Sequence, residues 1–198
     1  MSEQRHTLVF ATNNLFKAQE VNHILGNTFQ VLSLKEAGIE IDIAEPHDTL
    51  EANAREKSMT IYSLKKIDCF SEDTGLEVEA LDGAPGVKSA RFAGEPSNTT
   101  ANIEKLIHQL KNKQNRKAQF RTVISLVQKG IEKQFEGICK GHIALQPSGE
   151  NGFGYDPVFI PEGSAKTFAE MSTTEKNEYS HRRKAVEKLV AYLKIMTK

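Results

Sequence analysis

The sequence predicts an α/β protein: a single domain of two lobes, built on a mixed sheet with flanking helices. Strand-like apolar runs alternate with helical patterns from Thr7 to about Lys66, which is typical of βα units. Two long strand-like runs, Ala118–Gln128 and Glu132–Leu145, are joined by Lys129-Gly130, a hairpin signal. A long antiparallel ribbon in an otherwise βα chain indicates a second lobe, and an active-site cleft between the lobes is then expected. The 198 residues fit one such domain.

The composition excludes several classes of protein. Lys and Arg together number 26, as do Asp and Glu, so the chain lacks the basic surplus that phosphate contacts to nucleic acid require. Residues 1–6 are polar, and no apolar run is long enough to cross a bilayer. We therefore expect a cytoplasmic protein without a membrane span. Cys69 and Cys139 lie in strand-like runs without metal-ligand spacing, which favours plain buried thiols.

The first βα unit carries a candidate anion site. Thr7–Ala11 suits a buried parallel strand, and Leu15–Leu25 has helical spacing, with Thr12-Asn13-Asn14 as the turn between them. A helix start offers backbone N–H groups and a positive dipole end to an anion such as phosphate. Lys17 adds positive charge one turn into the helix. The alternative is an Asn helix cap beside a surface lysine.

The second unit combines an acidic loop with a lysine-bearing helix. Phe29–Leu34 is the expected strand, and Thr49 is expected to cap a helix that runs to about Lys66 and carries Lys57. Lys57 is either a surface lysine or part of a site. The loop between strand and helix contains four carboxylates: Glu40, Asp42, Glu45 and Asp48. Such loops are usually solvated, but one carboxylate could join Asp73 as a metal ligand.

Ser71–Gly75 is the strongest candidate for chemistry. Ile67–Phe70 is expected to end a short buried strand, so that Glu72 and Asp73 leave the interior and enter a glycine turn. Leu76–Gly94 is rich in glycine and predicts a long loop. Buried carboxylates must be paired, hydrogen-bonded or bound to a metal. Strand ends followed by loops often hold the chemistry of α/β enzymes, although a solvated surface turn is the alternative.

The C-terminal half supplies a loop with aromatic residues and two helices. A helix is expected from Asn98 through Leu110. Gly149–Pro161 is a loop whose aromatics Phe153 and Tyr155 look exposed and could stack a base. It is not a dinucleotide fingerprint, because Pro157 replaces the third glycine. A capping pattern at Ser172–Lys176 predicts a helix start, and a last helix is expected from about Ser180 to Met196. The run Ser180–Lys184 is rich in hydrogen-bond donors.

Five segments together resemble one family, in order, from about residue 7 to residue 195. They are Thr12–Lys17, Ser71–Val78, Gly83–Gly94, Gly152–Phe159, and Glu175–Asn177 with Ser180–Arg182. These segments resemble the inosine/xanthosine triphosphate pyrophosphatases. Five matching segments are far more specific than any single one. One departure is Phe16, which stands where the family commonly has glycine.

The resemblance implies a two-lobed Mg2+-dependent enzyme, usually a homodimer. It would hydrolyse dITP, ITP, XTP and dXTP to the monophosphate and pyrophosphate. Asp73 is implied as general base and metal ligand, with Glu45 as the second ligand and Glu40 or Asp42 as alternatives. The implied substrate-binding residues are Thr12, Asn13, Asn14, Lys17, Lys57, Thr74, Phe153, Gly154, Tyr155, Asp156, Lys176, His181 and Arg182. A pyrophosphatase for another nucleotide and a nucleotide-binding module without activity are the competing hypotheses.

Overall fold

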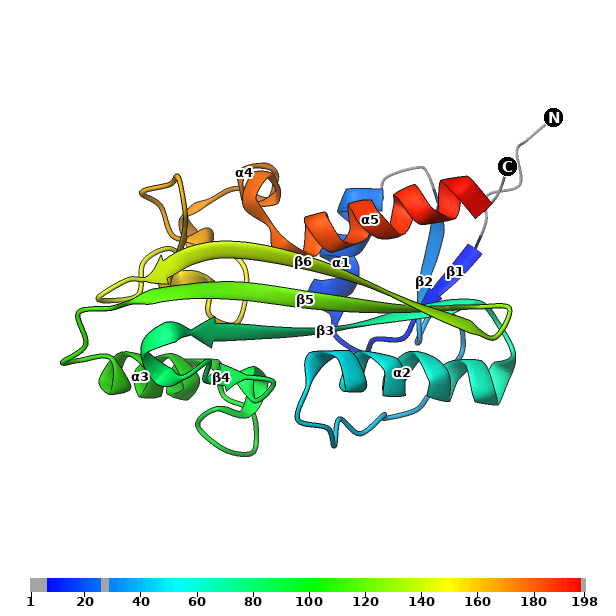
Figure 1. Ribbon diagram of the computed structural model, residues 1–198, viewed down its shortest axis with the longest axis horizontal. Helices are drawn as coiled ribbons and strands as arrows, with labels where there is room; N and C mark the ends of the chain where they lie inside the picture. Colours follow the sequence, from blue (N-terminus) through cyan, green and yellow to red (C-terminus); the bar gives the residue numbers. More distant parts are fainter. Residues whose placement is uncertain (1–6, 26–28, 197–198) are drawn as a thin grey trace. The chain divides into compact units, whose positions relative to one another are not determined.

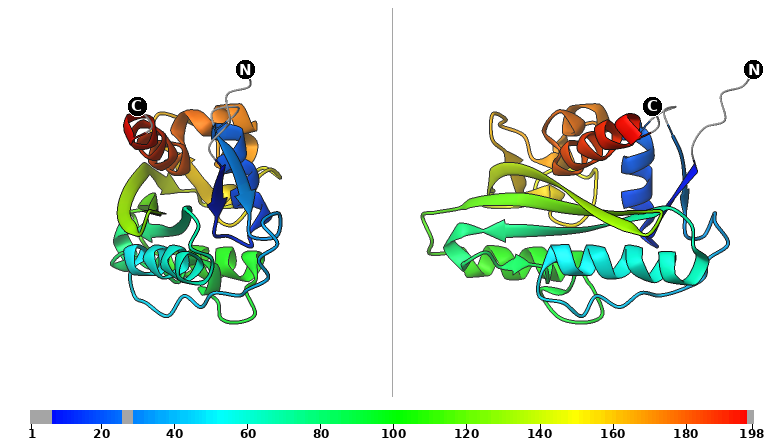
Figure 2. Two further views of the ribbon diagram at one scale, coloured as in Figure 1. Left: turned by 90° about the vertical axis from the view of Figure 1, so that its right-hand side faces the viewer. Right: turned by 45° about the vertical axis from the view of Figure 1, so that its right-hand side comes forward.

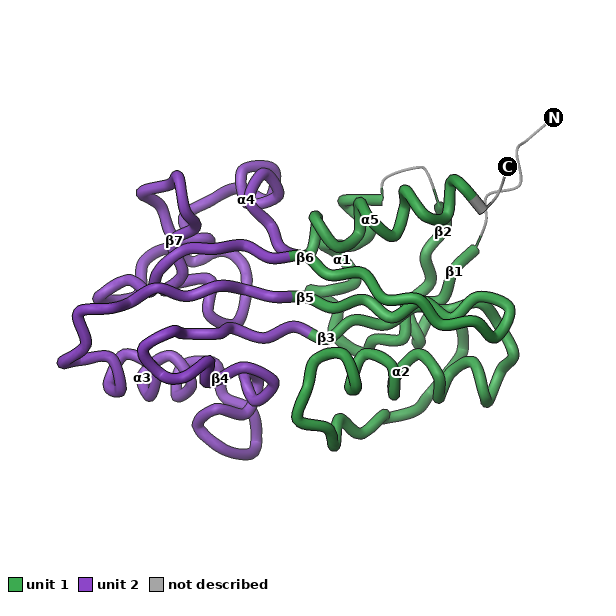
Figure 3. The backbone as a smooth tube through the Cα atoms, in the orientation of Figure 1, with its two compact units in different colours: residues 1–73, 122–137, 182–198 green, residues 74–121, 138–181 purple. Residues whose placement is uncertain are grey.

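The computed structural model describes residues 7–25 and 29–196, with the side chain of Met196 left out. Residues 1–6 lie outside these ranges, as does Gly26, the glycine that directly follows the predicted helix Leu15–Leu25. The chain forms two compact units (Figure 3): unit 1 comprises residues 1–73, 122–137 and 182–198, and unit 2 comprises residues 74–121 and 138–181. The expected single domain of two lobes with a cleft between them stays a prediction.

Seven strands and five α-helices form the described chain (Figure 1). The strands are β1 (Thr7–Phe10), β2 (Gln30–Ser33), β3 (Cys69–Val78), β4 (Pro85–Gly86), β5 (Lys117–Gln128), β6 (Ile131–Ile143) and β7 (Phe159–Pro161). The helices are α1 (Leu15–Leu25), α2 (Leu50–Lys65), α3 (Thr99–Gln109), α4 (Thr173–Tyr179) and α5 (His181–Met196). The predicted helices and most predicted strands are confirmed to within a few residues.

The sheet is mixed, as predicted. Its strands pair in the order β2-β1-β3-β5-β6-β7, with β4 on β3. β1 is parallel to β2 and β3, whereas β4 and β7 are antiparallel to β3 and β6. Lys129 and Gly130 join β5 to β6 with φ of 50° and 81°, the left-handed values that a two-residue hairpin turn requires. The α/β fold and the predicted hairpin are therefore confirmed.

Helices cover both faces of the sheet in unit 1 (Figure 2). Side chains alternate between the two faces of a strand. Phe10 and Phe70 lie on one face, where their rings stack with centroids 4.6 Å apart and pack in one apolar cluster with α1 and α5. Val9 and Cys69 lie on the other face and cluster with Ile61 of α2. This alternation decides where the carboxylates of β3 point.

Unit 2 has its own apolar core. Leu76 and Val78 of β3 pack with Ile103 and Leu106 of α3, and Phe159 belongs to the same cluster. The side chain of Asn98 accepts a hydrogen bond from the Ala101 N–H and so caps α3, the helix that the sequence predicted from Asn98. The core fixes the ends of β3, β5 and β6 that lie in unit 2.

The expected glycine turn at Ser71–Gly75 is wrong, because β3 continues through it to Val78. Gly75 lies in the strand beside β4, where Leu76 pairs with Gly86. A Cβ on Gly75 would stand 2.6 Å from the carbonyl oxygen of Gly86, so the glycine permits a close backbone approach. Glu72 and Asp73 are therefore consecutive residues within a buried strand.

Two smaller expectations also have outcomes. Cys69 and Cys139 are buried free thiols, as predicted. The last helix, expected from about Ser180 to Met196, is α5, which begins at His181 and contains the basic residues of the Ser180–Lys184 run. No helix within residues 7–25 and 29–196 combines the length and apolar character needed to cross a membrane.

Candidate active site

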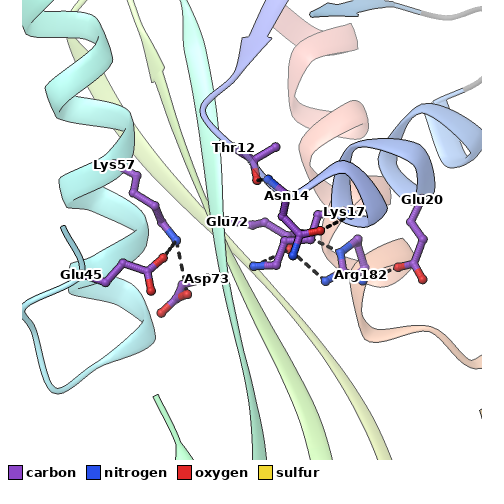
Figure 4. A network of polar contacts seen from close by, with 9 residues as sticks. All are labelled: Thr12, Asn14, Lys17, Glu20, Glu45, Lys57, Glu72, Asp73 and Arg182. Carbon is purple, nitrogen blue, oxygen red and sulfur yellow. Dashed lines mark hydrogen bonds and ion pairs between the residues drawn. The ribbon is translucent and has the colours of Figure 1, made fainter. Parts of the chain in front are cut away.

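Glu72 and Asp73 belong to two different clusters, on opposite faces of β3 (Figure 4). The strand alternation turns Asp73 toward α2 and Glu72 toward α1 and α5. Ser71, two residues before Asp73, donates its hydroxyl to the Ala54 carbonyl of α2. Because residues two apart in a strand share a face, this contact places Asp73 on the α2 face as well. The two carboxylates therefore act separately and not as a pair.

The Asp73 cluster joins the acidic loop, α2 and β3. Lys57 Nζ lies 2.6 Å from Glu45 Oε1 and 3.3 Å from Asp73 Oδ1. Lys57 is 8% exposed and Asp73 5%, while Glu45 remains partly exposed. Asp73 Oδ2 is buried and has no hydrogen-bond partner among the residues that the structure describes. One carboxylate oxygen is therefore available to water or a cation.

The electrostatics of this cluster favour a basic carboxylate. Burial raises the pKa of Asp73, and Lys57 and Lys17 oppose this shift without cancelling it. For Lys57, burial alone would lower the pKa, but Asp73 and Glu45 outweigh it and the pKa is raised. The lysine therefore keeps its charge beside the two carboxylates. A carboxyl with a raised pKa is better suited to accept a proton than a surface aspartate.

The donor set fits Mg2+ that is shared with a substrate. Mg2+ is held in proteins through one or two carboxylates, with substrate phosphates and water as the other ligands. Asp73 Oδ2 and Glu45 supply two hard oxygen donors. Within the described residues, no three His, Cys, Asp or Glu side chains gather to form a complete protein-only metal site. Glu40 and Asp42 are exposed, so Glu45 is the acidic-loop carboxylate that the structure brings to Asp73.

The Glu72 cluster is a buried ion-pair network. Arg182 Nε and Nη2 lie 2.8 and 2.9 Å from the two Glu72 oxygens, a bidentate pair. Arg182 Nη1 also donates to Glu20 of α1, and Lys17 Nζ stands 3.2 Å from Glu72 Oε1. Burial alone would raise the pKa of Glu72, but Arg182 and then Lys17 hold it well below its usual range. This network fixes Lys17 and α1 against β3.

The turn before α1 is ordered by its own asparagines. Asn14 Oδ1 accepts from the Lys17 N–H at 3.1 Å, and Asn14 N–H donates to Thr12 Oγ1 at 3.1 Å. Asn13 donates to the Ile41 carbonyl at 2.9 Å, which ties the turn to the acidic loop. The helix-cap alternative for asparagine is thus realised, while Lys17 is drawn into the Glu72 network and is not a free surface lysine.

Unit 2 carries a second group of predicted residues. Asp156 Oδ2 accepts from Lys176 Nζ at 2.7 Å and from the Phe153 N–H at 2.9 Å, and both charged groups are buried. Lys176 Nζ also lies 5.1 Å from the centroid of the Phe153 ring. Gly154 has φ of 61° in this loop. His181 stacks on Phe120 with ring centroids 4.7 Å apart.

Tyr155 differs from the sequence expectation. It is 4% exposed, so the expectation that Tyr155 is exposed is wrong, whereas Phe153 is half-buried. The sequence alone could not distinguish them, because the residue type of a loop aromatic does not show whether its side chain faces the core or solvent. Thr74, at the start of unit 2, is half-buried.

Sequence reasoning missed the roles of Glu72 and Glu20, and it grouped Arg182 with the donors of unit 2. A signal was present for Arg182. Ala185, Val186 and Leu189 form the buried face of α5, and Arg182 precedes them at helical spacing. An arginine on a core face requires a carboxylate partner, and Glu72 supplies it.

Comparison with known proteins identifies the family. A sequence profile of the Ham1 family matches residues 8–192. The chain belongs to the Ham1 family. Its Ham1 relatives include a dITP/XTP pyrophosphatase of Porphyromonas gingivalis, 50% identical over 187 residues, which cover 94% of this chain and 96% of the relative. Another, from Christiangramia forsetii, is 47% identical over 186 residues, which cover 94% of this chain and 98% of the relative.

Solved structures give the same family. The Staphylococcus aureus Ham1 protein aligns with a TM-score of 0.86 and 40% identity over 95% of this Ham1 chain and 98% of that one. The Coxiella burnetii HAM1 protein aligns with a TM-score of 0.87 and 32% identity over 96% of this chain and 98% of that one. The predicted family membership is therefore confirmed, and the mixed sheet with flanking helices is the fold of this family.

Proposed function

We propose that the chain is a nucleoside triphosphate pyrophosphatase that hydrolyses dITP, ITP, XTP and dXTP to the monophosphate and pyrophosphate. This activity removes non-standard purine nucleotides before they enter DNA or RNA. The observation that carries the proposal is the Asp73 cluster: Lys57 donates to Asp73 Oδ1 and to Glu45, while Asp73 Oδ2 is buried without a hydrogen-bond partner among the described residues. The names of the two bacterial relatives support it. A homodimer in the cytoplasm belongs to the same proposal.

The reaction needs a water activated at the α-phosphorus and a stabilised leaving group. The Asp73 carboxylate accepts a proton from the attacking water while the water oxygen bonds to the α-phosphorus. The bond from the α-phosphorus to the bridging oxygen breaks, and pyrophosphate leaves with that oxygen. Mg2+ held by Asp73 and Glu45 would offset the charge of the phosphate oxygens. Lys57 and Lys17 add fixed positive charge for the leaving group.

The triphosphate is assigned to the turn before α1. Thr12, Asn13 and Asn14 order this turn through their side chains, and the positive end of the α1 dipole stabilises an anion beside it. Lys17, fixed by Glu72, supplies a charge that is already positioned and loses little conformational entropy on binding. Thr74 follows Asp73 directly and is assigned a contact with the same phosphates.

The base is assigned to the unit 2 group. Phe153 offers an aromatic face, with Gly154 and Asp156 in the same loop, and Lys176 and His181 offer donors to the 6-carbonyl of hypoxanthine or xanthine. Adenine presents an amino group there, which leaves a buried donor unpaired at a cost of about 1 to 3 kcal/mol. That corresponds to about fivefold to 150-fold discrimination per contact. Arg182, held by Glu72 and Glu20, is assigned to the support of Lys17 and α1.

A substrate panel tests the proposal. Pyrophosphate release is measured from dITP, XTP, dATP, dGTP and dUTP, each with Mg2+ and with a chelator. We expect Mg2+-dependent release largely confined to dITP and XTP. Release from dUTP alone would keep the chemistry but reject the purine assignment. Binding of dITP without release from any nucleotide would favour a binding module.

The choice of Glu45 as the acidic-loop metal ligand gives a separate prediction. Glu45→Gln is expected to raise the Mg2+ concentration for half-maximal rate by about tenfold or more, because one of two anionic oxygen donors is lost. Glu40→Gln and Asp42→Asn, both exposed, serve as matched controls with little expected change. A Mg2+ titration of the three variants checks this. A large shift in either control with a normal Glu45→Gln would reassign the ligand.

A further inference from the structure

The segment Gly83–Gly94 matched the family resemblance, yet the proposed reaction gives it no role. In unit 2 it forms the short strand β4 and a single 3-10 turn, Ser89–Arg91. Ser89 is buried within it. A buried hydroxyl must be hydrogen-bonded, and the partners of Ser89 indicate what the segment holds in place.

Ser89 joins β3 to β4 through its side chain. Its Oγ accepts from the Leu76 N–H at 2.8 Å and donates to the Gly86 carbonyl at 2.6 Å. Leu76 is the second residue after Thr74, and Gly75 between them has no Cβ to hold β4 away. The hydroxyl therefore fixes the backbone of Ser89 against the stretch of β3 that follows Asp73.

The Ser89 backbone in turn holds the aromatic loop. Its carbonyl accepts from the Tyr155 hydroxyl at 2.9 Å, and the Tyr155 ring packs in the same apolar cluster as Val158 and Phe159. Burial raises the pKa of Tyr155, so the phenol keeps its proton as a donor. Tyr155 thus anchors its loop at one point on Ser89.

The anchor lies next to the residues that present a base. Asp156 follows Tyr155 directly, and its Oδ2 holds both the Phe153 N–H and Lys176 Nζ. Gly154 precedes Tyr155 with φ of 61°, and a glycine restricts the backbone less than any other residue. A displaced Tyr155 would therefore carry Asp156 with it and shift both the Phe153 ring and the Lys176 ammonium.

We propose that Ser89 and Tyr155 are positioning residues for base recognition, acting through Asp156 on Phe153 and Lys176. This inference rests on the proposed function, since it concerns how that site recognises its base. It also separates Tyr155 from Phe153: the Phe153 ring meets the base, whereas the Tyr155 hydroxyl holds the loop. The Gly83–Gly94 segment thereby gains a role in specificity without touching the substrate.

The test compares Tyr155→Phe, Ser89→Ala and the double variant with the wild type. Tyr155→Phe keeps the ring and removes only the hydroxyl, so a stacking role would survive it. The measurements are kcat and KM for dITP and dGTP with Mg2+, the dissociation constant of dITP with chelator by calorimetry, and the melting temperature. Tyr192→Phe is the matched control, because Tyr192 is a partly buried tyrosine whose ring packs on Phe135 and Lys133.

Each single variant is expected to raise KM and the dissociation constant for dITP by about fivefold, because each weakens the one Tyr155–Ser89 hydrogen bond that anchors the loop. The kcat should change less than about twofold. The preference for dITP over dGTP should fall by a similar factor. In the double variant, KM and the dissociation constant should rise by no more than about the larger of the two single-variant increases, because both hydroxyls act through the Ser89 backbone. Tyr192→Phe should match the wild type.

Two results would overturn the inference. One is an unchanged KM, dissociation constant and dITP preference in Tyr155→Phe, with or without a lower melting temperature, since that describes a purely structural hydroxyl. The other is a fold-increase in the dissociation constant of the double variant that equals the product of the two single-variant fold-increases, since the two hydroxyls would then act independently. If the wild type binds dITP without hydrolysing it, the proposed function fails, and the dissociation constants still decide the inference. If it neither binds nor hydrolyses dITP, both fail.

Discussion

Replacing Asp73 by Asn is expected to lower kcat for dITP by about a hundredfold to ten-thousandfold, the range for a lost general base. KM should change far less, because the amide keeps the volume of the side chain and the lysines that meet the triphosphate remain. Asn cannot accept the water proton, and it replaces an anionic ligand by a neutral one. Steady-state pyrophosphate release at saturating Mg2+ and dITP measures the effect.

The matched control for this experiment is Asp82→Asn. Asp82 is an exposed aspartate with φ of 52°, a conformation that Asn also accepts readily. Its variant should keep the wild-type kcat, which rules out a general effect of losing one negative charge. Near-normal turnover of Asp73→Asn at saturating Mg2+ would remove the base role from Asp73.

Strand alternation explains why Glu72 and Asp73 have different partners although they are neighbours in the sequence. If Glu72 and Asp73 lay in a turn, as predicted from the sequence, their carboxylates could act together at one site. In a strand they must point to opposite faces, and β3 continues because Gly75 meets the backbone of Gly86. Glycine serves both turns and close approaches, so the sequence alone does not decide between them.

The elements with strong local signals were predicted well. Thr49 and Ser172 cap helices as expected, since a cap depends on residues within one turn. The Lys57–Glu45 contact joins residues 12 positions apart through a loop without regular structure, and no local pattern selects Glu45 over Glu40 or Asp42. The Arg182–Glu72 pair spans 110 positions and depends entirely on tertiary packing.

Replacing Arg182 by Met is expected to cause the largest loss of stability, about 3 to 5 kcal/mol, because a buried carboxylate loses its bidentate partner. For a chain of this size, that lowers the melting temperature by roughly 6 to 20 °C. Arg182 is 1% exposed and Glu72 2% exposed, so water does not replace the lost bonds. Thermal or denaturant unfolding of both proteins at pH 7 measures the difference.

The next residue of α5 provides the control. Arg183 pairs with Glu187 at 2.7 Å, but both side chains are exposed, so Arg183→Met should cost less than about 0.5 kcal/mol of folding stability.

The pH dependence of stability provides a second check. Glu72 has its pKa lowered in the folded protein, so its stabilisation is complete above its ordinary pKa of 4.5 and is lost as the pH falls below that value. The stability difference between wild type and Arg182→Met should therefore narrow on acidification. A difference that stays constant from pH 7 to pH 3 would show that packing of the arginine, and not its charge, stabilises this side of the sheet.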